Sequence, residues 1–285
     1  MFKIPVLKLS FLLLLTYAGS VSANQSKHFT QDDYPSVEAA VEDIRATLET
    51  QRFSIDAIIN HAAAAESVGL QLRPTTVIFA GHSFFEYVLI RRSQLAALDI
   101  PFKFLAFEDE TGKIRVEIND EGYLVDRHRI PLRDRLINRL DRAINQFGRL
   151  ENGIIEIESK QSVDDTVSAL LTRLEELGFR IPIPGGIDFQ DRAHRKGLRL
   201  RPTRLIVFGN PLVGSPLMEI DQSIGIDLPQ KMLVYEMKKD KVFIAFNDPA
   251  FLAKRHGLQK NAELETRLEN IRNALTGIAT VAATP

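Results

Sequence analysis

The chain of 285 residues contains no cysteine and no tryptophan. Without cysteine it can form no disulfides and perform no thiol chemistry, so its stability has to come from packed apolar cores. Its charge is nearly balanced, with 36 basic and 37 acidic residues. A dedicated nucleic-acid-binding protein needs a basic surface that displaces counterions. This balance therefore argues against nucleic acid as a partner.

Beyond the first 23 residues, no segment is apolar over a stretch long enough to form a membrane-spanning helix. Residues 1–23 have the three parts of a secretory signal peptide, with Lys3 and Lys8, an apolar run at 9–17 and a small-x-small motif at 21–23. The apolar run is shorter than the roughly 20 residues that a bilayer requires. We therefore expect a periplasmic or secreted protein, the alternative being an uncleaved N-terminal anchor.

An internal repeat extends over nearly all of the mature sequence. Residues 59–130 align without a gap with residues 187–258, at a constant offset of 128. The identical pairs include Arg-Pro-Thr at 73–75 and 201–203, Asn-Asp at 119–120 and 247–248, and Arg-His at 127–128 and 255–256. A fixed offset over this length indicates duplication. The sequence thus predicts two tandem domains, residues 24–150 and 151–285.

Both copies show the same order of expected elements. Apolar residues at helical spacing predict amphipathic helices at 37–48 and 163–177, and at 132–144 and 264–275 near the ends of the copies. Strands are expected at 53–59, 75–79, 154–158 and 203–208, with hairpins at 102–118 and 231–246, the latter turning at Lys239-Asp240. The tail after Thr276 is expected to be frayed. This order predicts an α+β fold in each copy.

The second copy resembles the bacterial family called domain of unknown function 302. The resemblance rests on Leu-Arg-Pro-Thr at 200–203, Phe-Gly-Asn-Pro at 208–211, Gly-Ser-Pro-Leu-Met at 214–218, Asp-Leu-Pro at 227–229 and the stretch 246–258. The first copy departs from this pattern at 80–83 and 120–122, but keeps Asn60-His61 where the second has Asp188-Phe189.

This resemblance implies an antiparallel sheet with helices on one face, similar to the TATA-binding-protein class. Single-domain members resemble homodimer formers, so the tandem chain is expected to be a monomer with an internal pseudo-dimer. The family has no established reaction, and the resemblance therefore implies no catalytic residues and no cofactor. A fold analogy to a DNA-binding protein is not evidence for DNA binding.

One candidate ligand site is the loop at Gly209 and Asn210. It follows an expected strand and leads into a helix start, where backbone N–H groups can bind an anion. The alternative interpretation is a structural turn in which Ser215 caps the helix and Pro216 is its first residue.

A second candidate site is a polar set present in both copies: Asn119, Asp120, Arg127 and His128, with Asn247, Asp248, Arg255 and His256. Its functional interpretation is a ligand site with a histidine oriented by a carboxylate. The alternative is a helix capped by the aspartate, whose last-turn Arg and His complement the helix dipole.

Two further patterns carry less information. Lys103 with Glu108, and Lys231 with Glu236, are expected to form cross-strand ion pairs, the alternative being ligand-facing pairs. The histidines show neither an HExxH motif nor a spacing of three or four, so no metal site is predicted.

The sequence leaves three functional hypotheses. The first is a non-enzymatic periplasmic protein that binds a small molecule or an envelope protein between or beside its copies. The second is an enzyme with a polar site around Asn210, Asn247, Asp248 and His256. The third is a structural or assembly factor of the envelope.

Overall fold

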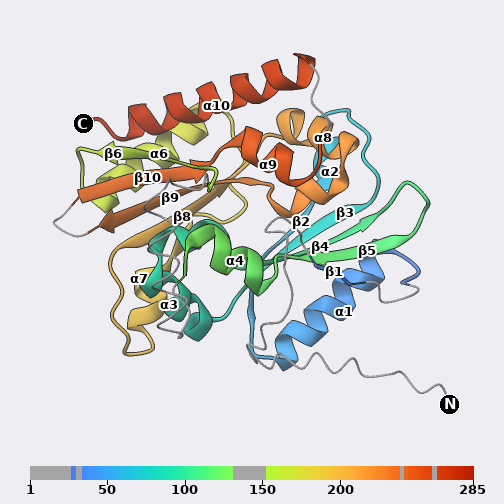
Figure 1. Ribbon diagram of the computed structural model, residues 1–285, viewed down its shortest axis with the longest axis horizontal. Helices are drawn as coiled ribbons and strands as arrows, with labels where there is room; N and C mark the ends of the chain where they lie inside the picture. The colour runs from blue at the N-terminus through green and yellow to red at the C-terminus, as the bar shows by residue number, and fades with distance from the viewer. Residues whose placement is uncertain (1–26, 30–33, 131–151, 238–240, 259–261) are drawn as a thin grey trace.

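The computed structural model describes residues 27–29, 34–130, 152–237, 241–258 and 262–285. Within these residues the chain forms two five-stranded antiparallel sheets, one in each copy (Figure 1). The strand orders are β1-β5-β4-β3-β2 and β6-β10-β9-β8-β7, so the two sheets have the same topology. The predicted α+β tandem fold is confirmed. The expected signal peptide, the helix expected at 132–144 and the turn at Lys239-Asp240 lie outside the described residues.

The elements of the first copy follow the predicted order closely. They are β1 (Lys27–Phe29), α1 (Val37–Thr50), β2 (Ser54–Asn60), α2 (His61–Glu66), β3 (Thr75–Gly81), α3 (Ser83–Arg92), the 3₁₀ helix η1 (Gln94–Leu98), β4 (Phe102–Glu108), β5 (Ile114–Ile118) and α4 (Glu121–His128).

The second copy repeats this order, and a long helix follows α9. Its elements are β6 (Ile154–Ser159), α6 (Val163–Glu176), β7 (Ile187–Asp188), α7 (Phe189–His194), β8 (Thr203–Phe208), α8 (Pro211–Ile220), the 3₁₀ helix η2 (Gln222–Ile226), β9 (Gln230–Met237), β10 (Lys241–Asn247), α9 (Pro249–Arg255) and α10 (Ala262–Ala282).

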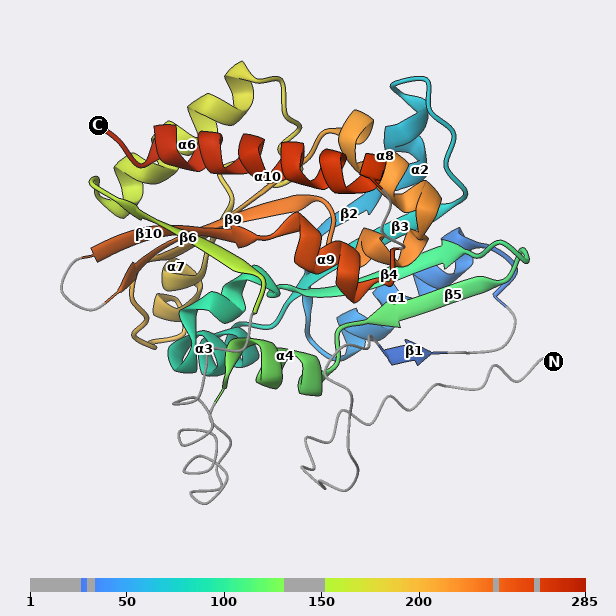
Figure 2. The same ribbon diagram turned by 45° about the horizontal axis from the view of Figure 1, so that its top comes forward.

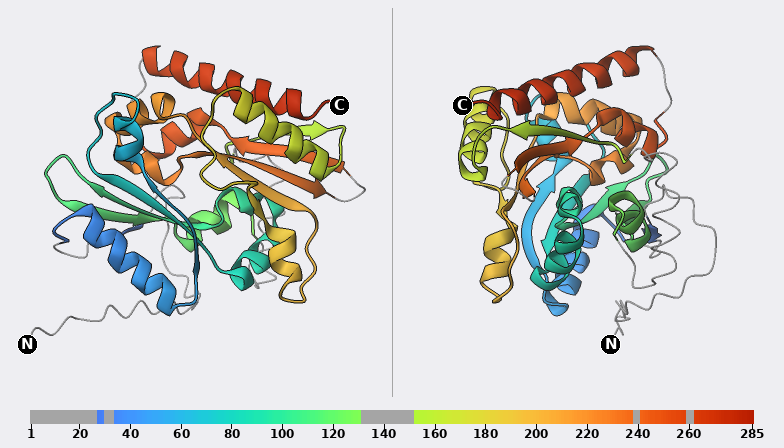
Figure 3. Two further views of the ribbon diagram at one scale, coloured as in Figure 1. Left: turned by 180° about the vertical axis from the view of Figure 1, so that it is seen from behind. Right: turned by 60° about the vertical axis from the view of Figure 1, so that its left-hand side comes forward.

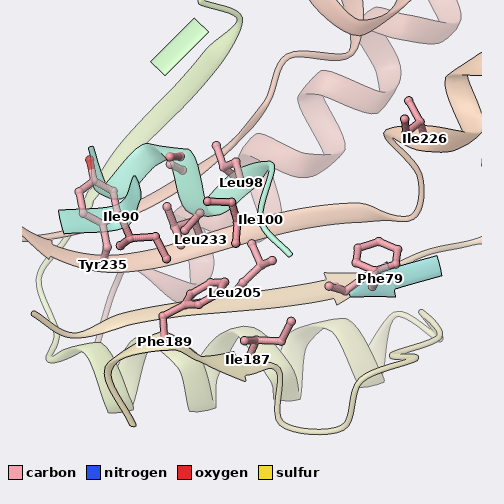
Figure 4. Close-up of a cluster of buried hydrophobic side chains, with 14 of the residues drawn as sticks. Phe79, Ile90, Leu98, Ile100, Ile187, Phe189, Leu205, Ile226, Leu233 and Tyr235 are labelled. Atoms are coloured by element: carbon pink, nitrogen blue, oxygen red, sulfur yellow. The ribbon is translucent and has the colours of Figure 1, made fainter. Parts of the chain in front are cut away.

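Each sheet is apolar on both faces, because alternate residues of a strand point to opposite sides. In β3, Ile78 and Ala80 pack under α1, which covers the outer face of the first sheet (Figure 3). Val77 and Phe79 point the other way, into a core shared with Leu205 and Leu233 of the second copy (Figure 4). The two copies thus meet through the inner faces of their sheets, with η1 of the first copy packed on the second sheet and η2 of the second copy on the first.

Helix α10 corrects one expectation from the sequence. The tail after Thr276 is not frayed, because the helix continues to Ala282 and lies along α6 (Figure 2). Ala279 and Ala282 are fully buried in the outer core of the second copy. Small side chains allow the two helices to pack closely. The small residues of this segment, from which fraying was expected, therefore form a tight contact with α6.

The loop before β7 depends on glycine. Gly185 and Gly186 both have φ near +70°, at +72° and +75°. A Cβ on Gly186 would lie 2.5 Å from the carbonyl oxygen of Leu205, whereas a Cβ on Gly185 would meet no atom within 4 Å.

We predict that Gly186→Ala lowers the free energy of unfolding by about 2–3 kcal/mol, from the left-handed backbone together with the clash. Gly185→Ala is the matched control and should cost about 1–2 kcal/mol, from the backbone alone. Urea denaturation of both variants measures the difference. Equal losses would show that the contact with Leu205 relaxes freely.

Candidate functional site

Six of the residues singled out from the sequence meet where the two copies join. They are Asn119, Arg127, His128, Asn247, Arg255 and His256, and all are buried. Four further buried residues belong to the same group: Asp99, Lys103, Asp227 and Lys231. We call these ten residues the interface cluster.

A carboxylate lies at the centre of each half of the interface cluster. Asp99 accepts hydrogen bonds from Arg127 Nη1 at 2.8 Å and Lys103 Nζ at 3.2 Å, and lies 2.7 Å from His128 Nε2. Asp227 occupies the equivalent position in the second copy. It accepts from Arg255 Nη1 at 2.5 Å and Lys103 Nζ at 3.4 Å, and lies 2.8 Å from His256 Nε2.

Three contacts of the interface cluster cross between the copies. Arg127 Nη2 donates to Asn247 Oδ1 at 2.8 Å, and Arg255 Nη2 donates to Asn119 Oδ1. Lys103 bonds the carboxylates of both copies, as described above. Each copy therefore supplies hydrogen-bond partners to the other, which accounts for the occurrence of these residue types in both copies.

The charges of the interface cluster decide its protonation state. Burial alone would raise the pKa of Asp99, but Arg127 and Lys103 outweigh it and hold that pKa well below its usual range. Arg255 and Lys103 do the same for Asp227. Burial lowers the pKa of His128. At neutral pH both carboxylates are ionised, and His128 is a neutral ring oriented by Asp99.

The interface cluster is sealed from solvent. The side chains of Asp99, Asp227 and His128 are 0% exposed, and that of His256 is 3% exposed. A catalytic acid or base has to come within hydrogen-bond reach of its substrate. A His–Asp pair in this position orients groups inside the protein and offers no open face to a substrate.

The two remaining residues of the predicted polar set, Asp120 and Asp248, lie outside the interface cluster. Asp120 caps α4 by accepting from the N–H of Tyr123 at 2.7 Å. Asp248 caps α9 by accepting from the N–H of Ala250 at 2.9 Å, and it pairs with Arg272 at 2.7 Å. The four residues of the hypothetical enzyme site do not converge: Asn247 and His256 are in the cluster, and Asp248 and Asn210 cap helices.

The predicted ion pairs of Lys103 with Glu108 and of Lys231 with Glu236 are wrong. Lys103 bonds Asp99 and Asp227, and Lys231 Nζ donates to the backbone carbonyl of Asp227 at 2.7 Å. Residues five apart on one strand point to opposite faces, so each lysine faces the core between the copies while its glutamate faces away. The signal that could have found the correct partners is the recurrence of Asp99 and Lys103 at 227 and 231.

The two remaining predicted residues, Gly209 and Asn210, line a groove between the copies. The groove has a volume of about 1150 Å³ and lies between α2 of the first copy and α8 and α10 of the second. Figure 2 shows α2 and α8 side by side near the start of α10. Asn210 itself caps α8 by accepting from the N–H of Leu212 at 3.0 Å.

The expected start of α8 is therefore wrong by five residues. Asn210 is the cap and Pro211 the first helical residue, whereas Ser215 and Pro216 lie inside the helix. Asn210-Pro211 and Ser215-Pro216 each combine a favourable cap residue with a proline suited to the first helical position, and the helix begins at the earlier pair. The hydroxyl of Ser215 is thereby free to face the groove, since it is not needed to cap the helix.

The groove combines an apolar surface with buried polar atoms. Ile58, Leu212 and Val213 line it and are among the exposed large apolar residues of the protein. His61 and Ser215 also line it and are only 5% and 1% exposed. Within the described parts of the chain, His61 Nε2 and Ser215 Oγ are buried without a hydrogen-bond partner, as is Gln230 Oε1, another groove atom.

The repeat shows why a groove is present at this place. The contact between α2 and α8 has a pseudo-symmetric counterpart between α7 and α3. There, Arg192 binds Asp56 at 2.5 Å and Glu86 at 2.9 Å. At the offset of 128, Arg192 corresponds to Ala64 and Glu86 to Gly214, both of which line the groove. Two long charged side chains on one side are thus matched by two small residues on the other.

The same comparison singles out the buried polar residues of the groove. His61 corresponds to Phe189, which is buried in the shared apolar core, and Ser215 corresponds to Tyr87. The polar atoms of His61 and Ser215 are therefore particular to the groove side of the molecule. Neither residue was predicted as a site residue from the sequence, although the departure of position 61 from its counterpart is visible in the alignment.

No group of three or more His, Asp or Glu side chains that could hold a metal ion occurs in the part of the chain that the structure describes. In the same part, no helix is both long and apolar enough to cross a membrane.

Each of the curated proteins that are similar to this chain matches slightly less than half of it. The chain is 35% identical over 132 residues to the "Fluoride-specific ion channel FluC 1" of Brucella suis biovar 1 (strain 1330), covering 46% of this chain and 49% of that protein. The "Fluoride-specific ion channel FluC 2" of Brucella melitensis biotype 1 is also 35% identical over 132 residues, covering 46% of each chain. The chain thus spans about half the length of these curated relatives.

Among solved structures, the chain is similar to the crystal structure of an uncharacterized conserved protein DUF302 from Bacillus stearothermophilus. That likeness has 18% identity and a TM-score of 0.40, and covers 46% of this chain and 98% of the other. The model of the family "Domain of unknown function DUF302" matches residues 30–147 and 155–275. The chain therefore belongs to the DUF302 family and contains two copies of its domain.

Proposed function

We propose that this protein is an exported, non-enzymatic binding protein that holds a small molecule in the groove between its two copies. The observation that carries the proposal is the groove of about 1150 Å³, whose apolar lining contains buried polar atoms without partners. Small-molecule sites are typically concave, mostly apolar, furnished with a few polar groups and about 300–1,000 Å³ in volume. The groove is concave and mostly apolar with a few polar groups, and is somewhat larger than this range. It lies at an interface between domains, where such sites are frequent.

The interface cluster supports a binding protein over an enzyme. Its His–Asp pairs are the most catalytic-looking groups in the sequence, but their side chains are closed off inside the core. Several contacts of the cluster join the two copies. The cluster also contains buried polar atoms without partners, as the groove does, but it lies in the closed core, whereas the groove offers room for a ligand.

Export is part of the proposal and rests on the N-terminal sequence. The basic, apolar and small-residue segments of residues 1–23 follow the order of a signal peptide, and the absence of cysteine suits any redox environment. The curated relatives are named fluoride-specific ion channels, but the chain matches only about half of their length. We do not extend channel activity to it.

We predict that the purified protein binds N-phenyl-1-naphthylamine, an uncharged apolar dye that brightens when it leaves water. Leu212→Asp should weaken this binding about tenfold, because it removes apolar contact and places a charge in the lining of the groove. Titration of the dye, followed by fluorescence, measures the dissociation constant.

The matched control for this prediction is Phe84→Asp. Phe84 is the counterpart of Leu212 in the first copy and is equally exposed, at 58%, but it lies outside the groove lining. Its replacement should leave dye binding unchanged. Dye binding that is absent, or equally sensitive to both substitutions, would contradict the proposed site.

A further inference from the structure

We infer, on the basis of the proposed function, that the ligand is an uncharged amphiphile that bonds His61 and Ser215. Such a molecule has an apolar chain or ring system and a hydroxyl or carbonyl group. Long-chain alcohols, monoacylglycerols and hydroxylated ring systems share this chemistry.

The first step is the burial of the two polar residues. His61 is 5% and Ser215 1% exposed, and both line the groove. A buried donor or acceptor without a partner costs free energy, and most such atoms in native proteins are paired. His61 Nε2 and Ser215 Oγ have no hydrogen-bond partner among the described residues. A ligand group that bonds them would relieve this cost.

The second step is the kind of group that these atoms accept. A serine hydroxyl both donates and accepts, and a neutral imidazole has one donor and one acceptor nitrogen. Burial lowers the pKa of His61 to about 4, so its ring is neutral at pH 7. Gln230 Oε1, a third atom of the groove without a partner, only accepts. A hydroxyl group can donate to one of these atoms and accept from another.

The third step concerns charge. Of the residues that line the groove, only Arg180, Glu263 and Arg267 are charged. Arg267 pairs with Glu263 at 3.5 Å, and Arg180 Nη2 donates to Ser67 Oγ at 2.8 Å. Lys231 lies close enough to His61 to lower its pKa, so the charge nearest to that ring is positive. A cationic ligand group beside His61 and Ser215 would therefore lose its hydration without gaining an opposite charge, which is costly.

The fourth step is the remainder of the groove. Its other lining includes Phe179, Phe208, Leu228 and Leu275, which provide an apolar wall. The volume of about 1150 Å³ exceeds the range of most small-molecule sites, so there is room for an extended chain or several rings. An apolar body with one uncharged polar end matches this distribution.

The test compares two ligands with the same tail, octanol and octyltrimethylammonium, as competitors of N-phenyl-1-naphthylamine. Octanol should displace the dye from the unmodified protein at a concentration about tenfold lower than octyltrimethylammonium. Ser215→Ala and His61→Phe should each weaken octanol about three- to tenfold, the effect of one lost hydrogen bond, and leave octyltrimethylammonium unchanged. Phenylalanine is a suitable replacement because Phe189 occupies the equivalent position of the second copy.

The thermal unfolding midpoint separates a binding role from a structural one. Ser215→Ala should not lower it, because the hydroxyl that it removes has no partner in the protein. His61→Phe also removes the hydrogen bonding of the ring to the backbone of Gly225 and Leu228, so Ser215→Ala is the variant that separates the two roles. The proposed ligand class would be overturned if octanol and octyltrimethylammonium competed equally, or if both variants left octanol binding intact. The proposed function would still stand in that case if dye binding depended on Leu212. An absence of saturable dye binding would remove both.

Discussion

The Asp227→Asn variant is expected to lose about 3–5 kcal/mol of its free energy of unfolding, the cost of leaving buried charges without a partner. Asp227 is completely buried and accepts from Arg255 and Lys103, with His256 beside it. Asparagine has nearly the same shape, so the substitution removes the negative charge without opening a cavity. Urea denaturation followed by circular dichroism measures the loss.

The matched control is Asp191→Asn. Asp191 also pairs with an arginine, Arg195, but both side chains are exposed, and such surface pairs contribute less than about 1 kcal/mol. Asp99→Asn should behave like Asp227→Asn, because Asp99 holds the equivalent position in the first copy. If Asp227→Asn cost no more than Asp191→Asn, the interface cluster would not be what holds the copies in register.

The second large effect is a pair of opposite pH dependences. Burial lowers the pKa of His61 from 6.5 to about 4, against hydrogen bonds to the backbone of Gly225 and Leu228 and with help from Lys231. The unfolded state then binds the proton more readily, so this group reduces stability as the pH falls from about 6.5 to 4. Burial raises the pKa of Glu86 from 4.5 to about 7, against the attraction of Arg192 and with help from Asp56. This group reduces stability as the pH rises from about 4.5 to 7.

These two contributions offset each other in the unmodified protein. Each shift of pKa corresponds to about 3 kcal/mol. His61→Phe removes the His61 contribution, so between pH 4 and 6.5 its free energy of unfolding should fall by about 3 kcal/mol relative to that of the unmodified protein. Glu86→Gln removes the opposite contribution, so between pH 4.5 and 7 its free energy of unfolding should rise by a similar amount relative to that of the unmodified protein.

Urea denaturation at a series of pH values tests both variants. The double variant serves as the control, because the two opposite changes cancel and its pH dependence should follow that of the unmodified protein. Slopes of the same sign in the two single variants would contradict the assignment of these opposing effects to His61 and Glu86.

The elements of the fold could be predicted from the sequence because their signals are local. The apolar spacing predicted a helix at 37–48 where α1 spans Val37–Thr50, and the predicted strand at 203–208 coincides with β8. The repeat then supplied the tandem arrangement. Where two local signals competed, as for the start of α8, the pattern alone did not decide between them.

The site residues were predictable only in part because their partners are distant in the chain. The sequence singled out Arg127 and Asn247, but their hydrogen bond joins residues 120 positions apart. Lys103 was paired with a residue on its own strand, since nothing local indicates Asp227 as its partner. His61 and Ser215 gain their meaning only when α2 and α8 come together from different copies.

If the groove is the ligand site that we propose, the difference between the two pseudo-symmetric sides of the molecule determines how many ligands it binds. Two identical subunits related by a two-fold axis would present every pocket twice. Here one side carries the bridge of Arg192 to Asp56 and Glu86, and the other carries Ala64, Gly214 and the groove. Fusion of the two copies in one chain frees each side to change alone, so the protein should take up one ligand per polypeptide, where its symmetric ancestor would have held two per dimer.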